Sequence, residues 1–339
     1  MRSSKRLIFS LGLSLCLGLA FVSSQSTEVV YFEGDPSLRD GGGRVKALDY
    51  DSSVKTGDSI LTGQRDIVEL AQGKDTSIKI RPNTVFTIRE IDKGGQKEQV
   101  LTASVGAVAM RFNRLSTKEP RVGSVGTVAG IRGTELTIYA GPDGSALFVV
   151  DSGLVSLETA EGTVDLAQNE GVEVSASGIA GEKFSVIGRE QDFSSWAEGK
   201  TEAFLADPIT ALEQVQIKMQ DFRSGLDEWL AKYQAAKVES DAAVAKMNAI
   251  SDKAEQEKYR DETWAKLSLQ TGNAVLNYRY HALSAFSMRR YVLGPMYVQQ
   301  RTRNILKPSA EYAAFLKSYT SVLNEYKAVF GPYLDTVDY

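Results

Sequence analysis

Apolar and polar residues alternate along short runs in the first half of the chain. Asp66–Leu70 and Glu135–Tyr139 are examples, and Gly, Asp and Asn residues separate each run from the next. A period of two places one side chain in a core and the next in solvent, which is typical of β-strands. The runs recur about every 8–12 residues, a spacing typical of an all-β sandwich, barrel or solenoid. Residues 25–190 are therefore predicted to form an all-β domain.

The second half of the chain has a helical pattern. Large apolar residues are spaced by three and four positions, so that they share one face of a helix. In the first helix of this kind they are Leu212, Val215, Met219, Phe222, Leu226, Trp229 and Tyr233. In the last they are Tyr312, Leu316, Tyr319, Leu323, Tyr326 and Phe330. These residues are predicted to form the core of an α-helical domain over residues 191–339.

Prolines and glycines predict where the helices begin and end. We call a row of apolar residues along one helix face a seam. The pair Asp207-Pro208 predicts the start of the helix with the first seam, because Asp is a good N-cap and Pro fits the first turn. Breaks are expected at Thr271-Gly272 and Gly294-Pro295, and a stop at Gly331-Pro332. The expected result is a bundle, or elongated hairpins, of roughly four to six helices.

Composition changes where the pattern changes. Of the 29 Gly residues, 22 lie in residues 25–190, whereas 11 of the 14 Tyr residues follow residue 190. Glycine is typical of turns and tyrosine here falls on helix seams. The predicted fold class is therefore α+β with two segregated domains, the first all-β and the second α-helical.

Residues 1–24 resemble an export signal. Arg2, Lys5 and Arg6 precede an uncharged apolar run, Leu7–Val22, and small residues follow, so cleavage is expected before Gln25. An apolar run of this length is short for a membrane span, which needs about 20 residues. We therefore expect an exported protein of the bacterial periplasm or cell envelope, with no transmembrane span in the mature chain. Removal of the signal takes the formal net charge from −4 to −7.

The chain has one Cys and one His, Cys16 and His281. A closed zinc site needs about four Cys or His ligands, so this class of site is excluded. Cys16 lies in the predicted signal, after residues that match a lipidation motif only loosely, and its lipidation is left open. His281 is interpreted as a packed or interface residue on a helix. No carboxylates follow a calcium-loop or other metal pattern, and we predict no catalytic residues, no metal and no cofactor.

Several motifs in the β half, in order, resemble the FecR domain family. Val54–Gly63 reads VKTGDSILTG, and Val125–Ile138 reads VGTVAGIRGTELTI, the strongest match. Weaker matches are Ile80–Thr84, Leu101–Val108 and Val149–Val155. Together they cover roughly residues 30–175, about half of the mature chain.

The resemblance implies a β-solenoid-like stack of short strands. The family-motif residues, interpreted as structural, are Gly57, Asp58, Gly63, Gly130, Arg132, Gly133, Thr134, Glu135 and Gly153. The glycines permit tight connections, and Arg132 is expected to bind turn carbonyls or a carboxylate such as Glu135. The best-known family members are anti-sigma regulators with a cytoplasmic domain before a membrane span. Only six residues precede the apolar run here, so that role is not carried over.

One stretch of the helical half differs in charge from the rest of this acidic protein. Residues 263–310 contain no Asp or Glu but several cations and tyrosines. The candidate partner-binding residues in this stretch are Arg279, His281, Arg289, Arg290, Tyr291, Arg301 and Arg303. Such a surface could attract an envelope protein or an anionic cell-wall or lipid component. The alternative is that these cations pair with the acidic helices of residues 207–262.

The sequence thus predicts a non-catalytic exported envelope protein, an interaction or scaffold module. The alternative is a periplasmic signalling or regulatory adaptor related to FecR-type sensors. A second alternative is an enzyme acting on a wall polymer, which would need two carboxylates roughly 5–10 Å apart. The acidic mature charge disfavours a nucleic-acid partner, and the oligomeric state is left open.

Overall fold

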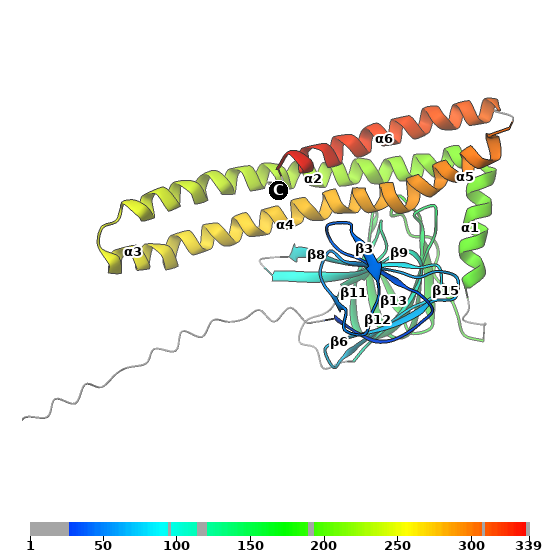
Figure 1. The fold of residues 1–339 in the computed structure, drawn as a ribbon, viewed down its shortest axis with the longest axis horizontal. Coiled ribbons are helices and arrows are strands. Elements are labelled where there is room, and N and C mark those ends of the chain that lie inside the picture. Colours follow the sequence, from blue (N-terminus) through cyan, green and yellow to red (C-terminus); the bar gives the residue numbers. More distant parts are fainter. Residues whose placement is uncertain (1–26, 94–95, 114–120, 189–192, 307–308, 337–339) are drawn as a thin grey trace, which may run out of the picture.

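The computed structural model describes residues 27–93, 96–113, 121–188, 193–306 and 309–336. Strands form the first part and helices the second, which confirms the predicted segregation of β and α structure (Figure 1). The predicted export signal, with Cys16, lies outside the described residues. None of the helices within the described ranges is both long and apolar enough to cross a membrane.

The strands of the β region differ widely in length. They are β1 (Thr27–Glu33), β2 (Ser37–Arg39), β3 (Val45–Ala47), β4 (Ser53–Val54), β5 (Ser59–Leu61), β6 (Ile67–Gln72), β7 (Thr76–Ile80), β8 (Val85–Lys93), β9 (Gln96–Phe112), β10 (Arg121–Gly123), β11 (Val128–Ala140), β12 (Ala146–Thr159), β13 (Gly162–Ala167), β14 (Glu170–Val174) and β15 (Phe184–Ser185). All belong to one branched sheet. Its pairs are antiparallel except β9 with β10.

This pairing does not confirm the predicted solenoid. Stacked coils of a β-helix pair their strands in parallel, whereas here hairpins such as β8–β9 and β11–β12 supply most of the pairing. The long strand β9 belongs to two arms of the sheet: its first part pairs with β8, and its last part pairs with β7 and β11. Gly106 lies between the two parts with φ +88°, where a Cβ would lie 2.7 Å from the Asn83 carbonyl oxygen. Only glycine fits this position without strain.

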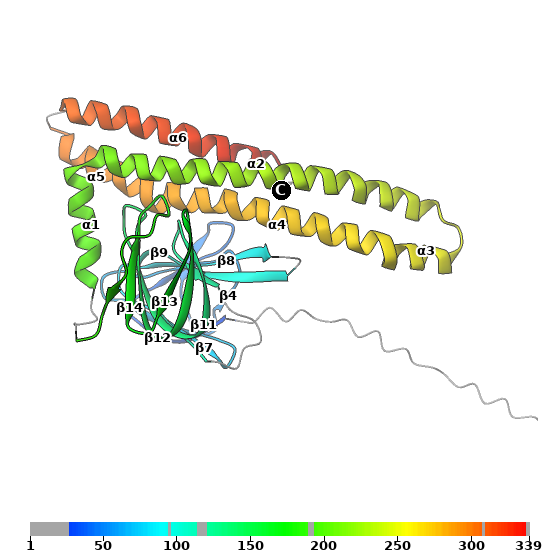
Figure 2. The same ribbon diagram turned by 180° about the vertical axis from the view of Figure 1, so that it is seen from behind.

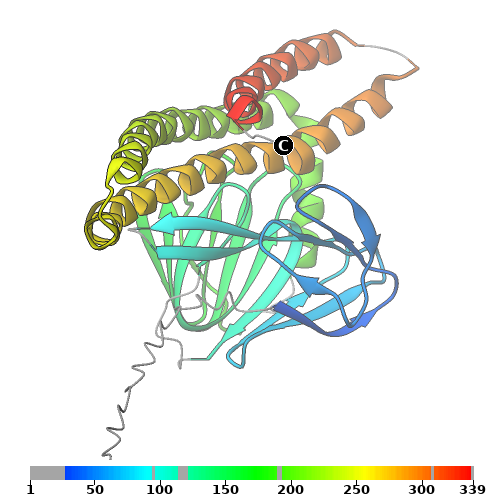
Figure 3. The same cartoon turned by 60° about the vertical axis from the view of Figure 1, so that its left-hand side comes forward.

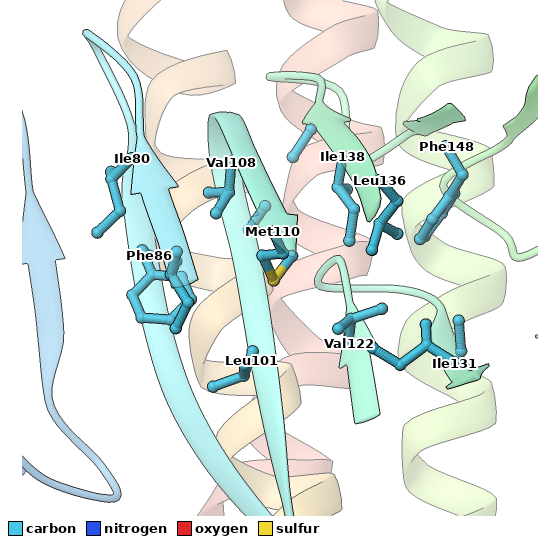
Figure 4. Close-up of a cluster of buried hydrophobic side chains, with 14 of the residues drawn as sticks. Ile80, Phe86, Leu101, Val108, Met110, Val122, Ile131, Leu136, Ile138 and Phe148 are labelled. Atoms are coloured by element: carbon cyan, nitrogen blue, oxygen red, sulfur yellow. The ribbon is translucent and has the colours of Figure 1, made fainter. Parts of the chain in front are cut away.

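Alternating strand residues give the β region one large apolar core. The residues drawn in Figure 4, among them Phe86, Met110 and Phe148, come from strands far apart in sequence and are essentially inaccessible to solvent. A second, small cluster joins Tyr139, Leu147 and Val149 to Trp196 of the first helix. The sheet therefore carries apolar contacts on more than one face.

The helical part begins after β15. Its elements are α1 (Ser194–Ala206), α2 (Pro208–Ala249), α3 (Lys253–Tyr259), the π-helical turn η1 (Arg260–Trp264), α4 (Ala265–Met288), the π-helical turn η2 (Arg289–Leu293), α5 (Gly294–Asn304) and α6 (Ala310–Thr336). Asp207 caps α2 as predicted, since its carboxylate accepts from the Thr210 N–H at 3.1 Å. We call residues 208–336 the helical arm.

The predicted helix breaks are wrong. Helix α4 continues through Gly272, where it packs along α2: the neighbouring Thr271 donates its hydroxyl to the Ala236 carbonyl of α2 at 3.2 Å. At Pro295 the chain passes from η2 into the first turn of α5, where a proline is tolerated. Helix α6 contains Pro332 and extends to Thr336, and Tyr333 in this last part packs in tilted geometry against the rings of Tyr278 and Phe330.

The predicted apolar seam of α2 is confirmed as part of the core of the helical arm, since Leu212, Val215 and Met219 are fully buried. The seam predicted for α6 is confirmed only in part. The most buried residues of that helix are Phe315, Val322 and Val329, which the seam did not include, and of the predicted residues only Tyr319 is also buried, while the others pack half-buried at the edge of the core. Helices α2 and α4 lie side by side and extend well past the sheet, while α6 covers only the part nearer α1 (Figures 1 and 2). At a rise of about 1.5 Å per residue, α2 is about 60 Å long.

The helical arm lies across the sheet region. Helix α4 contacts β8, and the β8–β9 hairpin lies beneath it (Figures 1 and 3). The core of the arm also includes Val125 and Ala176, which belong to loops of the β region. Beside the arm, Trp196 of α1 donates its indole N–H to Glu173 of β14 at 3.0 Å. The two halves are therefore joined by both apolar and polar contacts.

Candidate functional site

A cavity of about 370 Å³ lies where α4 and η2 meet the β region. We call it the junction cavity. The β region contributes Arg39, Asp40, Gly41, Gly42, Gly43, Thr56, Gly57, Ser59, Thr87, Ile88, Arg89 and Glu90. The helical arm contributes Leu276, Arg279, Tyr280, Leu283, Phe286, Ser287, Arg290 and Tyr291. Four guanidinium groups and two carboxylates thus line one space between the two halves.

Strand β8 brings Arg89 into this cavity. Phe86 and Ile88 point into the apolar core of the sheet, so the alternate residues Thr87 and Arg89 face the helical arm. The helical arm covers this second face, which explains why Arg89 is only 5% exposed. The strand is consequently buried on both sides.

The Arg89 guanidinium joins the two halves through hydrogen bonds to neutral groups. It donates to the Thr102 hydroxyl at 2.9 Å, to the Ser124 carbonyl at 2.9 Å and to the Ser284 hydroxyl of α4 at 2.7 Å. It also lies over the Tyr280 ring, 5.2 Å from the centroid. None of the described carboxylates forms an ion pair with it. Burial lowers the pKa of Arg89 below its ordinary value, because desolvation disfavours the charged form.

A second buried arginine in the same sheet shows the usual arrangement. Arg121 of β10 is 8% exposed and forms ion pairs with Glu98 at 3.1 Å and Glu158 at 2.6 Å. These pairs raise the pKa of Arg121, although its burial acts in the opposite direction. A buried charge is costly unless it is paired. Arg89 therefore stands out as a buried cation whose described partners are all neutral.

Arg39, at the end of β2, forms the second polar bridge between the halves. Its Nη1 donates to the Tyr291 hydroxyl of η2 at 2.6 Å, and its guanidinium lies 5.9 Å from the centre of that ring. The Nε of Arg39 is buried and has no hydrogen-bond partner within the described structure. A buried donor without an acceptor costs about 1–3 kcal/mol, so this group has unused capacity to bind an anion.

The glycine loop that follows Arg39 forms another wall of the cavity. The Asp58 carboxylate holds it in place by accepting from the Gly41 N–H at 3.1 Å and the Lys55 N–H at 2.9 Å. Asp40, at the start of the loop, is ion-paired with Arg44 at 2.9 Å. The predicted structural role of Asp58 fits these contacts, and it also positions the cavity wall.

Two exposed arginines of the helical arm lie at the cavity, Arg279 of α4 and Arg290 of η2. Neither forms an ion pair with any residue that the structure describes. Arg290 lies over the Phe286 and Tyr291 rings, 5.9 Å from each centre. Ion pairs on the facing helix α2, such as Lys232 with Glu228, lie within that helix instead. The alternative that these cations pair with the acidic helices therefore finds no support among the described residues.

The other candidate residues of this stretch lie elsewhere. Arg289 faces α6, where its charge acts on Tyr319 and Tyr326. Arg301 and Arg303 are exposed on α5, and Arg303 donates to the Leu205 carbonyl at 2.9 Å. The structure thus brings together three of the predicted partner-binding residues, Arg279, Arg290 and Tyr291, and separates the rest from them.

His281 packs against α2, in keeping with its interpretation as a packed residue. A Cβ on Gly225 would lie 2.3 Å from the imidazole, so the close approach depends on this glycine. The Nδ1 atom is buried without a hydrogen-bond partner within the described structure. Burial lowers the pKa of His281 below its usual 6.5.

Most of the family-motif residues occupy tight turns or a strand irregularity. Gly63 donates its N–H to Asp66 at 2.7 Å, and Gly57 has φ +93°. Gly133, with φ +52°, and Gly153, with φ +87°, face each other where the register of β11 and β12 shifts. Thr134 closes this bulge by donating to the Leu154 carbonyl at 2.8 Å.

Two expectations for the motif are wrong. Arg132 is exposed, and Glu135 accepts from Arg111 at 2.7 Å instead of from Arg132. The reason is that strand alternation places Ala129 and Ile131 in the core and Arg132 on the outer face, while Glu135 lies directly opposite Arg111 on β9. Gly130 has no positive φ, and a Cβ added to it would meet no atom within 4 Å, so neither crowding nor backbone conformation requires glycine there.

The sequence did not indicate the two arginines of the sheet, Arg39 and Arg89. Arg89 follows an apolar strand pattern, Val85–Ile88, and alternation alone would place it in solvent. Its burial depends on a helix about 195 positions away along the chain. No local sequence pattern distinguishes Arg39 or Arg89 from an exposed arginine.

The cavity is suited to binding more than to bond chemistry. Its two carboxylates, Asp40 and Glu90, are ion-paired with Arg44 and Lys97 at 2.9 and 3.5 Å. In the parts of the chain that the structure describes, no group of three or more His, Cys, Asp or Glu residues is placed to hold a metal ion. Guanidinium groups bind carboxylate and phosphate oxygens, often through two parallel hydrogen bonds.

No protein-family model matches the chain, and no curated protein does. Two solved structures, each described as a "putative anti-sigma factor" from Parabacteroides distasonis, are similar in part. The one at 1.65 Å resolution is 17% identical with a TM-score of 0.34, covering 42% of this chain and 65% of the other. The one at 2.50 Å is 16% identical with a TM-score of 0.33, covering 46% and 73%. The chain thus spans just under two thirds of the first, and the FecR resemblance stays a prediction.

Proposed function

We propose that this protein is a non-catalytic, exported protein of the bacterial cell envelope that binds an anionic group of another envelope component at the junction cavity. The partner is an envelope protein, a cell-wall polymer or a lipid. The observation that carries the proposal is the buried Arg89, whose described partners are all neutral, beside three further arginines in one cavity. An anion placed there would compensate charge that the protein leaves uncompensated.

The position of the cavity supports an interaction role. Its walls come from both halves of the molecule, so a partner would touch the sheet and the helical arm at once. The alternative of an enzyme acting on a wall polymer has less support, because both lining carboxylates, Asp40 and Glu90, are engaged with cations. A general acid requires a carboxyl free to hold and release a proton.

The second candidate function is a periplasmic signalling adaptor. A ligand held by two halves of a protein biases any equilibrium in which those halves move. The bonds from Arg39 to Tyr291 and from Arg89 to Ser284 would then report occupancy of the cavity to the arm. A change of arm position on partner binding distinguishes this candidate from a scaffold.

Crosslinking in intact cells, followed by identification of the captured partners, tests the proposal. The variant Arg279→Gln/Arg290→Gln removes two exposed cations at the cavity, and Arg301→Gln/Arg303→Gln removes two exposed cations of α5. We expect the first variant to lose a partner that the wild type and the second variant retain. Identical partners for all three proteins would contradict the proposal.

A further inference from the structure

We infer that the junction cavity binds a small amphiphilic oxyanion, a carboxylate or phosphate group joined to a short apolar chain or ring. The inference rests on the proposed function, because it names the ligand class of the same site. The proposed function leaves open what carries the anionic group, and this inference adds that the carrier is a small molecule that enters the cavity. Three observations support it: the unused donors, the apolar wall and the size of the cavity.

The anionic group would lie on the side of Arg39. The Nε of Arg39 is a buried donor with no acceptor in the described structure, and its Nη1 is already fixed by Tyr291. A side chain held in one position by such a bond binds an anion without losing further rotational freedom. Arg89 also lines the cavity and adds positive charge, as does Arg290, whose guanidinium lies over the Tyr291 ring.

The apolar part of the ligand would lie along α4. Leu276, Leu283 and Phe286 of that helix line the cavity. Leu283 is 38% exposed in this lining. A bare inorganic anion would leave this wall in contact with water, whereas an apolar chain would cover it and gain about 25 cal/mol per Å² buried.

The size of the cavity restricts the ligand further. Small-molecule sites have volumes of about 300–1,000 Å³, and about 370 Å³ lies near the lower limit. This volume fits one charged group with a short chain, and it is too small to enclose a folded element of another protein. A free metabolite and the end group of a lipid share this chemistry, so the experiment must separate them.

Titration calorimetry on the purified protein tests the inference. The probes are octyl phosphate, octanoate, inorganic phosphate and octylamine, each at concentrations below micelle formation. We expect octyl phosphate or octanoate to bind at least tenfold more tightly than inorganic phosphate, and octylamine not to bind. Vesicles containing phosphatidic acid form a separate arm: binding to vesicles with none to the soluble probes would overturn the small-molecule inference.

Two variants locate the binding. Arg39→Gln removes the unused donor, and Leu283→Glu places a negative charge on the apolar wall without deleting a described hydrogen bond. Each is expected to weaken octyl phosphate binding at least tenfold, while Arg301→Gln/Arg303→Gln leaves it unchanged. Circular dichroism melting identifies a variant that has failed to fold. Equal affinities for folded wild type and folded Leu283→Glu would overturn the inference.

The outcomes also separate the inference from the proposed function. If no soluble probe binds but Arg279→Gln/Arg290→Gln still loses its partner in cells, the ligand class is wrong and the interaction site stands. If octyl phosphate binds with the expected variant effects but crosslinked partners do not depend on the cavity, the ligand class stands and the partner proposal fails.

Discussion

The sheet and the helical arm differ in the kind of contact that holds them together. The sheet depends on partners distant in sequence, such as Gln72 with Thr27, and on glycines at positions with no room for a side chain. The core of the arm depends on apolar seams that recur within single helices, as along Leu212–Leu226. Glycine illustrates the difference: the sheet requires it at crowded positions such as Gly153, whereas Gly272 inside α4 has open space around it.

The junction differs from both halves. It is joined in part by side-chain hydrogen bonds across very large sequence separations, including Arg89 to Ser284 and Arg39 to Tyr291. Arg39, Arg89 and Tyr291 of these bonds also line the cavity. The same two arginines therefore contribute to attachment of the arm and to the proposed binding site.

The largest effect is expected from Gly153→Ala in the sheet. An added Cβ would lie 2.3 Å from the Gly133 carbonyl oxygen, and φ is +87° at this position. We expect a loss of about 3 kcal/mol in the free energy of unfolding, because strain and a backbone clash act together. Urea unfolding measures it. Gly130→Ala, with open space around it, is the matched control and should be nearly neutral.

Arg89→Met tests the attachment of the arm. The substitution keeps an apolar chain in place but removes the donors to Thr102, Ser124 and Ser284. Because removal of the buried charge offsets part of this loss, we expect a net destabilisation of about 2 kcal/mol. Thermal melting measures it. Arg132→Met, at an exposed position of the sheet, should change stability little; an equal loss for both would contradict the assigned role of Arg89.

Gly272→Ala in the helical arm is expected to change stability in the opposite direction from Gly153→Ala. This glycine lies inside α4, has no positive φ and has no neighbouring atom within 4 Å of an added Cβ. Alanine is favoured over glycine in a helix interior by about 0.5–1 kcal/mol, so the variant should be more stable by about that amount. The same urea measurement as for Gly153→Ala applies. A destabilised variant would mean that the backbone of α4 is not continuous at this residue.

The smallest expected effect is the pH dependence of stability that arises from His281. The folded-state pKa of His281 lies below its usual 6.5, chiefly because of burial. The unfolded chain therefore binds a proton before the folded chain does, and stability falls as the pH drops below about 6.5 towards the folded pKa. Asp221 and Glu228 oppose this shift and Lys218 adds to it.

The variant His281→Asn tests this pH effect. It should remove part of the loss of melting temperature between pH 7 and pH 5. Identical slopes of melting temperature against pH for the two proteins would show that His281 does not titrate as expected.

The sequence predicted the two segregated halves and the α2 seam because local periodicity determines both, but it left Phe315 and Val322 out of the buried face of α6. It missed the continuity of α4 at Gly272 and of α6 at Pro332, because packing against neighbouring helices outweighs a local preference for a break. It located Arg279, Arg290 and Tyr291 through charge and composition. Arg39 and Arg89 could not be predicted, since their partners on the helical arm lie roughly 200 or more residues away along the chain.

Hydrogen exchange with and without octyl phosphate tests the central claim most directly, because it locates a bound anion without any substitution. We expect slower exchange in three segments that meet only at the junction cavity: residues 39–43, 85–90 and 276–291. The α5 segment with Arg301 and Arg303 should be unaffected. Protection confined to α5, or spread evenly over the helical arm, would contradict the claim that the junction of sheet and arm is the binding site.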